Sequence, residues 1–137
     1  GNLDRRKMAA LIFQDKEVRK KVNGIVHPGV KKHIVELIEK ERIKGTSFFF
    51  VEAALLIEDK YDEICDELWY IYADEHVRRE RLMQNRGYSH QKIEGIMASQ
   101  LSEKEFSEHC DFKIDNGGEC ADTIKQIDRR MNTYETL

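Results

Sequence analysis

The sequence predicts an α/β fold in which helices alternate with the strands of a parallel sheet. In its first third, apolar residues recur every three or four positions, which is the period of one helix face. Two continuous apolar runs follow, FFFV at 48–51 and LWYIYA at 68–73, and such runs are typical of strands buried on both faces. A shorter run, FKIDN at 112–116, predicts a third strand. With 137 residues, the chain is long enough for one hydrophobic core.

The first third is predicted to be helical throughout. Its periodic apolar residues are Met8, Leu11, Ile12, Val30, Ile34, Leu37 and Ile38. Asp15 is suited to cap a short middle helix. Pro28, the only proline, is predicted to open a third helix at its first position, where the missing N–H is harmless. That helix should end at Lys44 and Gly45, before the first apolar run.

Helix start signals separate the later strands. Asp74 is expected to cap the helix that carries Arg78, Arg79 and Arg81. Ser89 should cap the next helix, and Ser102 with Glu105 has the spacing of a capping box. The inward side of the Ser89 helix is predicted to hold Ile93, Ile96 and Met97. A last helix is predicted from its apolar face, which is formed by Cys120, Ile124, Ile127, Met131 and Tyr134.

Composition excludes several classes of function. Lys and Arg number 23 against 26 Asp and Glu, and this net charge of -3 argues against general nucleic-acid binding. No apolar run approaches the roughly 20 residues of a membrane span, and the amino-terminal residues do not resemble a signal peptide, so we expect a cytoplasmic protein without membrane contact. The three cysteines have no CxxC spacing and predict neither a disulfide framework nor a zinc site.

Polar residues follow each predicted strand. Ligands of open α/β sheets bind outside the carboxyl ends of the strands, so 55–58, Asp74 and 116–118 should converge on one cleft. Arg81 and Arg86 come close to that edge, and the planar guanidinium group matches phosphate oxygens. The stretch RERLMQNRGYS is therefore interpreted as a hinged phosphate clamp. The alternative is a solvated helix face with Arg–Glu pairs.

Six stretches occur in an order that resembles the dephospho-coenzyme A kinase family: VHPGV, VEAALLIE, DELWYIYADE, RLMQNRGYS, ASQLS and HCDFKIDNGG. The resemblance implies a P-loop kinase that moves the γ-phosphate of ATP, with Mg²⁺, to the ribose 3'-hydroxyl of dephospho-coenzyme A. It also implies a parallel sheet with flanking helices, a helical substrate domain and a lid. Residues 1–45 would form the helical coenzyme A region. Residues 46–137 would form the rest of the nucleotide kinase core, with the lid at about 81–100.

The resemblance also implies roles for individual residues. Arg81 falls on a lid arginine, and Arg86 is the expected stand-in for a second one, both with catalytic roles. Asn116, with Gly117, is similar to the residues beside the adenine, although an Asn before two glycines also suits a plain turn. His27 and Lys31 match the substrate domain and could meet the phosphates of the coenzyme; a histidine before a helix also serves as a structural cap. No residue is assigned to a metal, and the acidic segment 58–67 is interpreted as a solvated loop.

One motif of that family is absent from the sequence. P-loop kinases cradle phosphates with G-x-x-x-x-G-K-S/T after a first strand, and these 137 residues contain neither. The resemblance implies that this strand lies at the centre of the sheet, between FFFVEA and LWYIYA. We expect the chain alone to be inactive, and a chain whose sheet lacks its centre to rearrange, to self-associate with another copy or to be poorly soluble. Two hypotheses follow: part of a complete kinase, or a non-catalytic fragment or assembly module of that fold.

Overall fold

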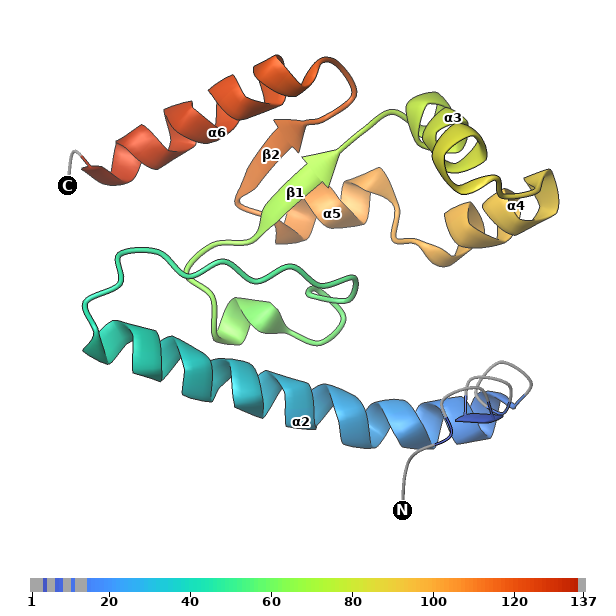
Figure 1. The fold of residues 1–137 in the computed structure, drawn as a ribbon, viewed down its shortest axis with the longest axis horizontal. Helices are drawn as coiled ribbons and strands as arrows, with labels where there is room; N and C mark the ends of the chain where they lie inside the picture. Colours follow the sequence, from blue (N-terminus) through green and yellow to red (C-terminus); the bar gives the residue numbers. More distant parts are fainter. Residues whose placement is uncertain (1–3, 5–6, 9–10, 12–14, 136–137) are drawn as a thin grey trace. The chain divides into compact units, whose positions relative to one another are not determined.

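The computed structural model describes residues 4, 7–8, 11 and 15–135 and divides the chain into two compact units, Gly1–Ile64 and Cys65–Leu137 (Figure 1). Within the first predicted helical stretch, Met8 and Leu11 are helical, and Ile12 lies outside the described residues. None of the described helices has the length and apolar content that a membrane crossing requires.

The first unit is built on one long helix, α2, which spans Lys16–Ile43. Asp15 caps its start, with Oδ1 accepting from the N–H groups of Glu17 at 2.8 Å and Val18 at 3.2 Å. The prediction that Pro28 begins a separate helix is wrong, because Pro28 lies inside α2. The capped turns before Pro28 already have helical geometry, and the proline removes only one hydrogen bond of this 28-residue helix. The predicted end is confirmed, with Lys44 as C-cap and Gly45 at φ 77°.

The predicted first strand is also wrong. Residues 48–53 are neither helix nor strand, and turns follow at 54–60 before the short 3-10 helix η1, Tyr61–Glu63. A strand needs a neighbour for its backbone N–H and C=O groups. No strand occurs among the described residues of this unit, so the apolar run has no partner strand within it. Phe50 is 67% exposed, although its ring stacks on Phe48 with centroids 6.3 Å apart.

The second unit confirms the α/β prediction with a parallel pair of strands. Strand β1 spans Trp69–Tyr72 and strand β2 spans Phe112–Asp115, in register from Trp69 opposite Phe112 to Tyr72 opposite Asp115. Three helices connect them: α3, Glu75–Arg86; α4, His90–Ser99; and α5, Glu103–His109. Helix α6, Cys120–Glu135, follows β2. Figure 1 shows this strand–helix–strand crossover, which parallel strands require.

The predicted caps are confirmed because each depends on a local hydrogen bond. Asp74 accepts from the N–H of His76 at 2.8 Å and starts α3. Ser89 caps α4, and Ser102 forms the expected reciprocal box with Glu105 at the start of α5. The most buried side chains of this unit are Leu68, Ala73, Ile93 and Ile114. Among the three predicted inward residues of α4, Ile93 is fully buried, and Ile96 and Met97 are half-buried.

Candidate functional site

The carboxyl ends of β1 and β2 place Asp74 and Asn116 at the same edge of the sheet. Both strands are parallel and end opposite each other, at Tyr72 and Asp115. The backbone N–H of Asn116 donates to the carbonyl of Tyr72 at 2.7 Å, which extends the ladder by one bond. The edge at which α/β proteins bind ligands is therefore formed here by the residues directly after each strand.

Arg81 reaches this edge from α3. Its Nη1 donates to the backbone carbonyl of Asn116 at 2.7 Å, and the side chain is half-buried. The structure thus brings together two residues that the sequence placed in one site. Arginine carries five N–H donors, so a guanidinium group held through one nitrogen keeps others for a further acceptor. The orientation of the Arg81 guanidinium group is therefore set by the loop after β2.

The loop after β2 is held by its own side chains and by α6. Asp115 Oδ1 accepts the N–H of Gly117 at 2.7 Å, and a Cβ added at Gly117 would meet this oxygen at 3.0 Å. Gln126 pairs with both backbone groups of Asp115, at 2.9 Å to its N–H and 2.8 Å to its carbonyl. Thr123 lies 3.1 Å from Asn116 Oδ1. A larger residue at position 117 would require the Asp115 carboxylate to shift slightly.

Sequence reasoning missed Thr123 and Gln126. The two residues lie three positions apart on α6, so they occupy one face of the helix. The available signal was their spacing: both are polar and lie in the first turns of the helix that follows β2. Without the structure, nothing distinguished them from an exposed polar face.

Arg86 lies apart from this cluster of contacts. It is the last residue of α3, its side chain is exposed, and it has no hydrogen bond or ion pair among the described residues. Gly87 follows at φ 60° and ends the helix, with its N–H donating to Met83 O at 3.0 Å. The exposed position leaves the charge of Arg86 available to a ligand.

Helices α3 and α4 are linked across the turn at Gly87. Arg79 forms a two-pronged pair with Glu94, at 2.5 Å and 3.2 Å, and also contacts Glu75 at 2.7 Å. Arg78 Nη1 donates to Gln100 Oε1 at 2.5 Å. The hydrogen bond from Arg79 lowers the pKa of the Glu94 carboxyl, so this link is charged at neutral pH. The arginine-rich face of α3 is therefore only partly solvated, because Arg79 binds α4 and Arg78 binds Gln100, which follows it.

In the first unit, His27 and Lys31 face the same turn. His27 Nδ1 lies 2.9 Å from Asp59 Oδ1. One turn further along α2, Lys31 Nζ donates to three oxygens, at 3.1 Å to Asp59 O, 2.7 Å to Lys60 O and 2.7 Å to Glu63 Oε2. Both candidate substrate residues therefore already bind the 59–63 segment, where Lys60 adopts a left-handed conformation at φ 53°.

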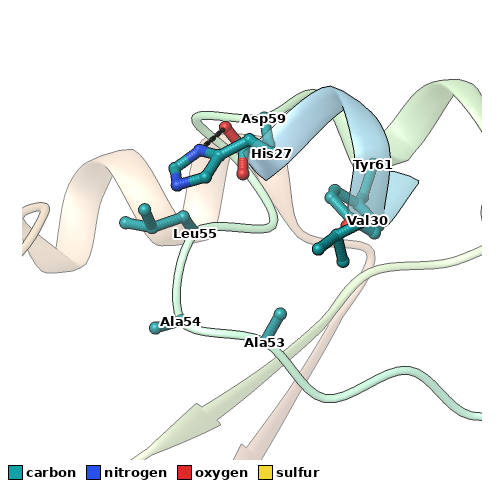
Figure 2. Close-up of a pocket in the computed structure, with 7 residues that line it drawn as sticks. All are labelled: His27, Val30, Ala53, Ala54, Leu55, Asp59 and Tyr61. Carbon is teal, nitrogen blue, oxygen red and sulfur yellow. Dashed lines mark hydrogen bonds and ion pairs between the residues drawn. The ribbon is translucent and has the colours of Figure 1, made fainter. Parts of the chain in front are cut away.

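A pocket of about 210 Å³ opens beside this pair. Figure 2 shows the His27 ring and Asp59 on one side of it, and Val30 with Tyr61 on another. The remaining wall is Ala53, Ala54 and Leu55, from the segment that follows the apolar run. The pocket thus combines an apolar wall with one imidazole–carboxylate pair, a composition suited to an apolar chain with a polar group.

The acidic segment is not simply a solvated loop, as the sequence had suggested. Asp59 and Glu63 bind His27 and Lys31, and the hydrogen bond from Lys31 lowers the pKa of the Glu63 carboxyl. At its end, Glu67 accepts hydrogen bonds from Trp69 Nε1 at 2.8 Å, from Tyr134 Oη and from Arg130. The unlike charges lie far apart in the sequence, so composition alone could not reveal these pairs.

A bound divalent ion would need a cluster of hard oxygen ligands. Within the described residues, no group of three or more His, Cys, Asp or Glu side chains could hold a metal ion. The described residues therefore offer no all-protein cage for a divalent ion, and a magnesium ion bound to phosphates does not need one.

Parallel strands joined by helices, with an arginine-bearing helix at their carboxyl ends, define an open α/β protein. The family model for Dephospho-CoA kinase matches residues 1–122, and the chain belongs to this family. The resemblance seen in the sequence and the predicted fold class are thereby confirmed.

Several curated relatives carry the description Dephospho-CoA kinase. The Aquifex aeolicus protein is 35% identical over 137 residues, which is all of this chain and 67% of the relative. The Fusobacterium nucleatum protein is 33% identical over 97% of this chain and 67% of its own length. The Symbiobacterium thermophilum protein is 31% identical over 93% of this chain and 54% of its own length. The chain thus spans between about half and two thirds of the relatives it matches.

Two solved structures share the fold. A crystal structure of a Thermus thermophilus protein superposes with a TM-score of 0.79 at 25% identity, covering 98% of this chain and 68% of that one. A dephospho-CoA kinase from Campylobacter jejuni superposes with a TM-score of 0.68 at 24% identity, covering 96% of this chain and 65% of that one. The second comparison supports the fold alone.

Proposed function

We propose that this chain forms the base-binding, lid and coenzyme-binding parts of a dephospho-coenzyme A kinase. The reaction transfers the γ-phosphate of ATP to the ribose 3'-hydroxyl of dephospho-coenzyme A, the last step of coenzyme A biosynthesis. Family membership supports the activity. The single observation that carries the assignment of a site is the hydrogen bond from Arg81 to the carbonyl of Asn116, because it joins a candidate phosphate-binding cation to the candidate base-binding loop.

Residues 1–45 would contribute the coenzyme region, and 46–137 the remaining kinase core with a lid at about 81–100. In this proposal Arg81 and Arg86 neutralise charge on the transferring phosphoryl group, which is the main contribution a protein makes to such reactions. Asn116 and Gly117 border the base. Arg81 is oriented by Asn116 O, so binding of the base and placement of the cation depend on the same loop.

His27 and Lys31 are proposed to face the coenzyme. The pocket beside His27 offers an apolar wall of Val30, Ala53 and Leu55, and the His27–Asp59 pair supplies a polar group at its side (Figure 2). Lys31 would act partly by fixing the 59–63 turn, because its three oxygen partners all belong to that segment.

ATP would be used as its magnesium complex in the cytoplasm, without nucleic acid or membrane. Mg²⁺ supplies charge neutralisation between the phosphates when it is bound. The roles proposed for Arg81, Arg86 and Asn116 need no metal ligand from the described residues.

The test compares two proteins, the polypeptide that the gene encodes and the 137-residue chain. We expect ATP-dependent phosphorylation of dephospho-coenzyme A by the first, and none by the second, because transfer needs a phosphate-cradling loop with its lysine. Turnover is measured by separation of coenzyme A from dephospho-coenzyme A. Failure of the gene's complete product to turn over would contradict the enzyme proposal and favour the alternative, a non-catalytic fragment or assembly module that self-associates.

A further inference from the structure

Asn116 is fixed by three hydrogen bonds from three elements. Its N–H donates to Tyr72 O at 2.7 Å on β1, and its carbonyl accepts from Arg81 Nη1 at 2.7 Å on α3. Its side-chain Oδ1 lies 3.1 Å from Thr123 Oγ1 on α6. The first two bonds set the backbone of Asn116. Only the third reaches the amide group, so Thr123 decides how that group is turned.

The Thr123 hydroxyl has one proton and two neighbouring acceptors. Asn116 Oδ1 is the nearer at 3.1 Å, and Asp115 O lies at 3.4 Å. Asp115 O already accepts from Gln126 Nε2 at 2.8 Å. The Thr123 hydroxyl therefore donates to Asn116 Oδ1, and this bond orients the amide oxygen toward α6. The other half of the amide, Nδ2, has no partner among the described residues.

We propose that Thr123 is a positioning residue that makes Asn116 a hydrogen-bond donor to the nucleotide base. With Oδ1 held toward α6 by Thr123, Asn116 offers Nδ2 and its two protons to the ligand. The ligand class is a purine nucleotide that presents a ring nitrogen acceptor to this loop. The inference rests on the proposed function, and it adds how the base is recognised: by donation from Asn116 Nδ2 to a ring nitrogen.

The loop geometry supports this reading. The Asp115–Gly117 turn is closed by the bond from the Gly117 N–H to Asp115 Oδ1, and Gln126 holds both backbone groups of Asp115. These contacts do not involve the Asn116 side chain. A change at Thr123 should therefore release the amide group without opening the turn.

The test uses the protein that the gene encodes, with Thr123→Val, Thr123→Ser and the control Thr133→Val. Thr133 lies on the same helix, and its hydroxyl donates to Arg130 O, away from the loop. Calorimetry measures the Kd of ATP and of its 1-deaza, 3-deaza and 7-deaza analogues, each of which lacks one ring acceptor. Thr123→Val should weaken ATP binding by about 3- to 10-fold, whereas Thr123→Ser and Thr133→Val should stay within about 2-fold, since both keep the Asn116 contact.

The analogues separate positioning from a general structural effect. One deaza analogue should bind the wild type about as weakly as ATP binds the Thr123→Val variant. For that analogue, the Kd of the Thr123→Val variant should equal the Kd of the wild type. An equal loss with all four nucleotides, or no loss with any, overturns the inference. A wild type that binds none of them overturns the proposed function and the inference with it, so the two failures differ in the wild-type titration.

A second measurement needs no variant. In the NMR spectrum of the wild type, the Asn116 Nδ2 protons should exchange quickly with solvent and one should shift downfield when ATP is added. Slow exchange without ATP and no shift on its addition would mean that Nδ2, and not Oδ1, binds Thr123, and the inference would be wrong.

Discussion

Arg81 on α3 donates from Nη1 to the backbone carbonyl of Asn116 at 2.7 Å, although the two residues are 35 positions apart. The bond joins the helix after β1 to the loop after β2. Because the donor is charged and half-buried, the loop and the helix are coupled more strongly than a solvated arginine would allow.

The first prediction concerns Arg81→Ala in the protein that the gene encodes. We expect kcat to fall by about 10- to 100-fold, because the variant lacks the cation proposed to act on the transferring group. The KM for dephospho-coenzyme A should change little. Steady-state kinetics with both substrates varied check this. Arg129→Ala, at an exposed position of α6, is the matched control and should leave both constants unchanged. A raised coenzyme KM with an intact kcat would contradict the role given to Arg81.

The second prediction compares two glycines with equal space around them. An added Cβ meets no atom within 4 Å at Gly87 or at Gly95, so only the backbone distinguishes them. Gly87 is left-handed at φ 60°, and Gly87→Ala should destabilise the protein by about 1 kcal/mol. Gly95 lies inside α4, and Gly95→Ala should stabilise it by about 0.5 to 1 kcal/mol. Urea unfolding measures both; shifts of the same sign would exclude this explanation.

The third prediction concerns Glu67, which binds α6 to the segment before β1. Partial burial opposes ionisation of its carboxyl, but hydrogen bonds from Tyr134, Trp69 and Arg130 outweigh this and lower the pKa of Glu67 below 4.5. Glu67→Gln should reduce the free energy of unfolding by about 1 to 3 kcal/mol at neutral pH. A carboxylate with a lowered pKa contributes fully to the free energy of unfolding when the pH is above its ordinary pKa of 4.5. This contribution disappears as the pH falls through the lowered pKa of the folded protein.

The measurement for Glu67 is therefore urea unfolding of the variant and the wild type over a range of pH. The difference between them should be constant near neutrality and shrink in acid. Glu108→Gln is the control, since Glu108 is exposed and only approaches Lys104 at 3.7 Å. A difference that grows as the pH falls would show that the carboxylate is not the stabilising form.

Local signals in the sequence predicted most of the second unit. Asp74, Ser89 and Ser102 each bind an N–H within three residues, so their positions follow from the sequence alone. The parallel pairing of 69–72 with 112–115 follows from two apolar runs separated by helices. From this pairing, the meeting of Asp74 and Asn116 at one sheet edge could also be predicted.

The errors arose where distant partners decide the structure. The run at 48–51 has the composition of a strand, but a strand requires a neighbour, and the described residues of its unit contain none. Proline is common at the first position of a helix, but the helix that contains Pro28 already begins after the cap at Asp15. In the site, the bond from Arg81 to Asn116 and that from Thr123 to Asn116 depend on how α3 and α6 pack, which no spacing in the sequence determines.

The fourth prediction compares Lys31 with its neighbour Lys32. Lys31 Nζ binds two backbone carbonyls and Glu63, whereas Lys32 is exposed and has no side-chain contact among the described residues. Lys31→Ala should lower the thermal midpoint by about 3 to 6 °C, because the 59–63 turn loses its central donor. Lys32→Ala should leave the midpoint unchanged. Scanning calorimetry checks both, and equal midpoints for the two variants would show that the contacts of Lys31 do not stabilise the turn.

The last prediction concerns the proposed lid at about 81–100. Helix α4 has ten residues and one fully buried side chain, Ile93, and it is linked to α3 by exposed polar contacts such as Arg79 with Glu94. Helices this short have little stability of their own, so we expect local opening to cost less free energy here than in β1 or α6. The turn at Gly87, with its left-handed backbone, is the proposed joint.

Hydrogen exchange of the protein that the gene encodes tests this lid. Amides from Arg86 through Gln100 should exchange quickly in the free protein and slow clearly with a non-hydrolysable ATP analogue, because the proposed closure would bring Arg81 and Arg86 onto the phosphates and exclude water. Glu94→Gln is the matched variant: it weakens the bond to Arg79, so it should speed exchange in the free form and have less effect with the analogue bound. Amides of β2 serve as the internal reference. Equal protection of 86–100 in both states would mean that Ile93 holds α4 permanently in the core, and the phosphate clamp would have to be abandoned.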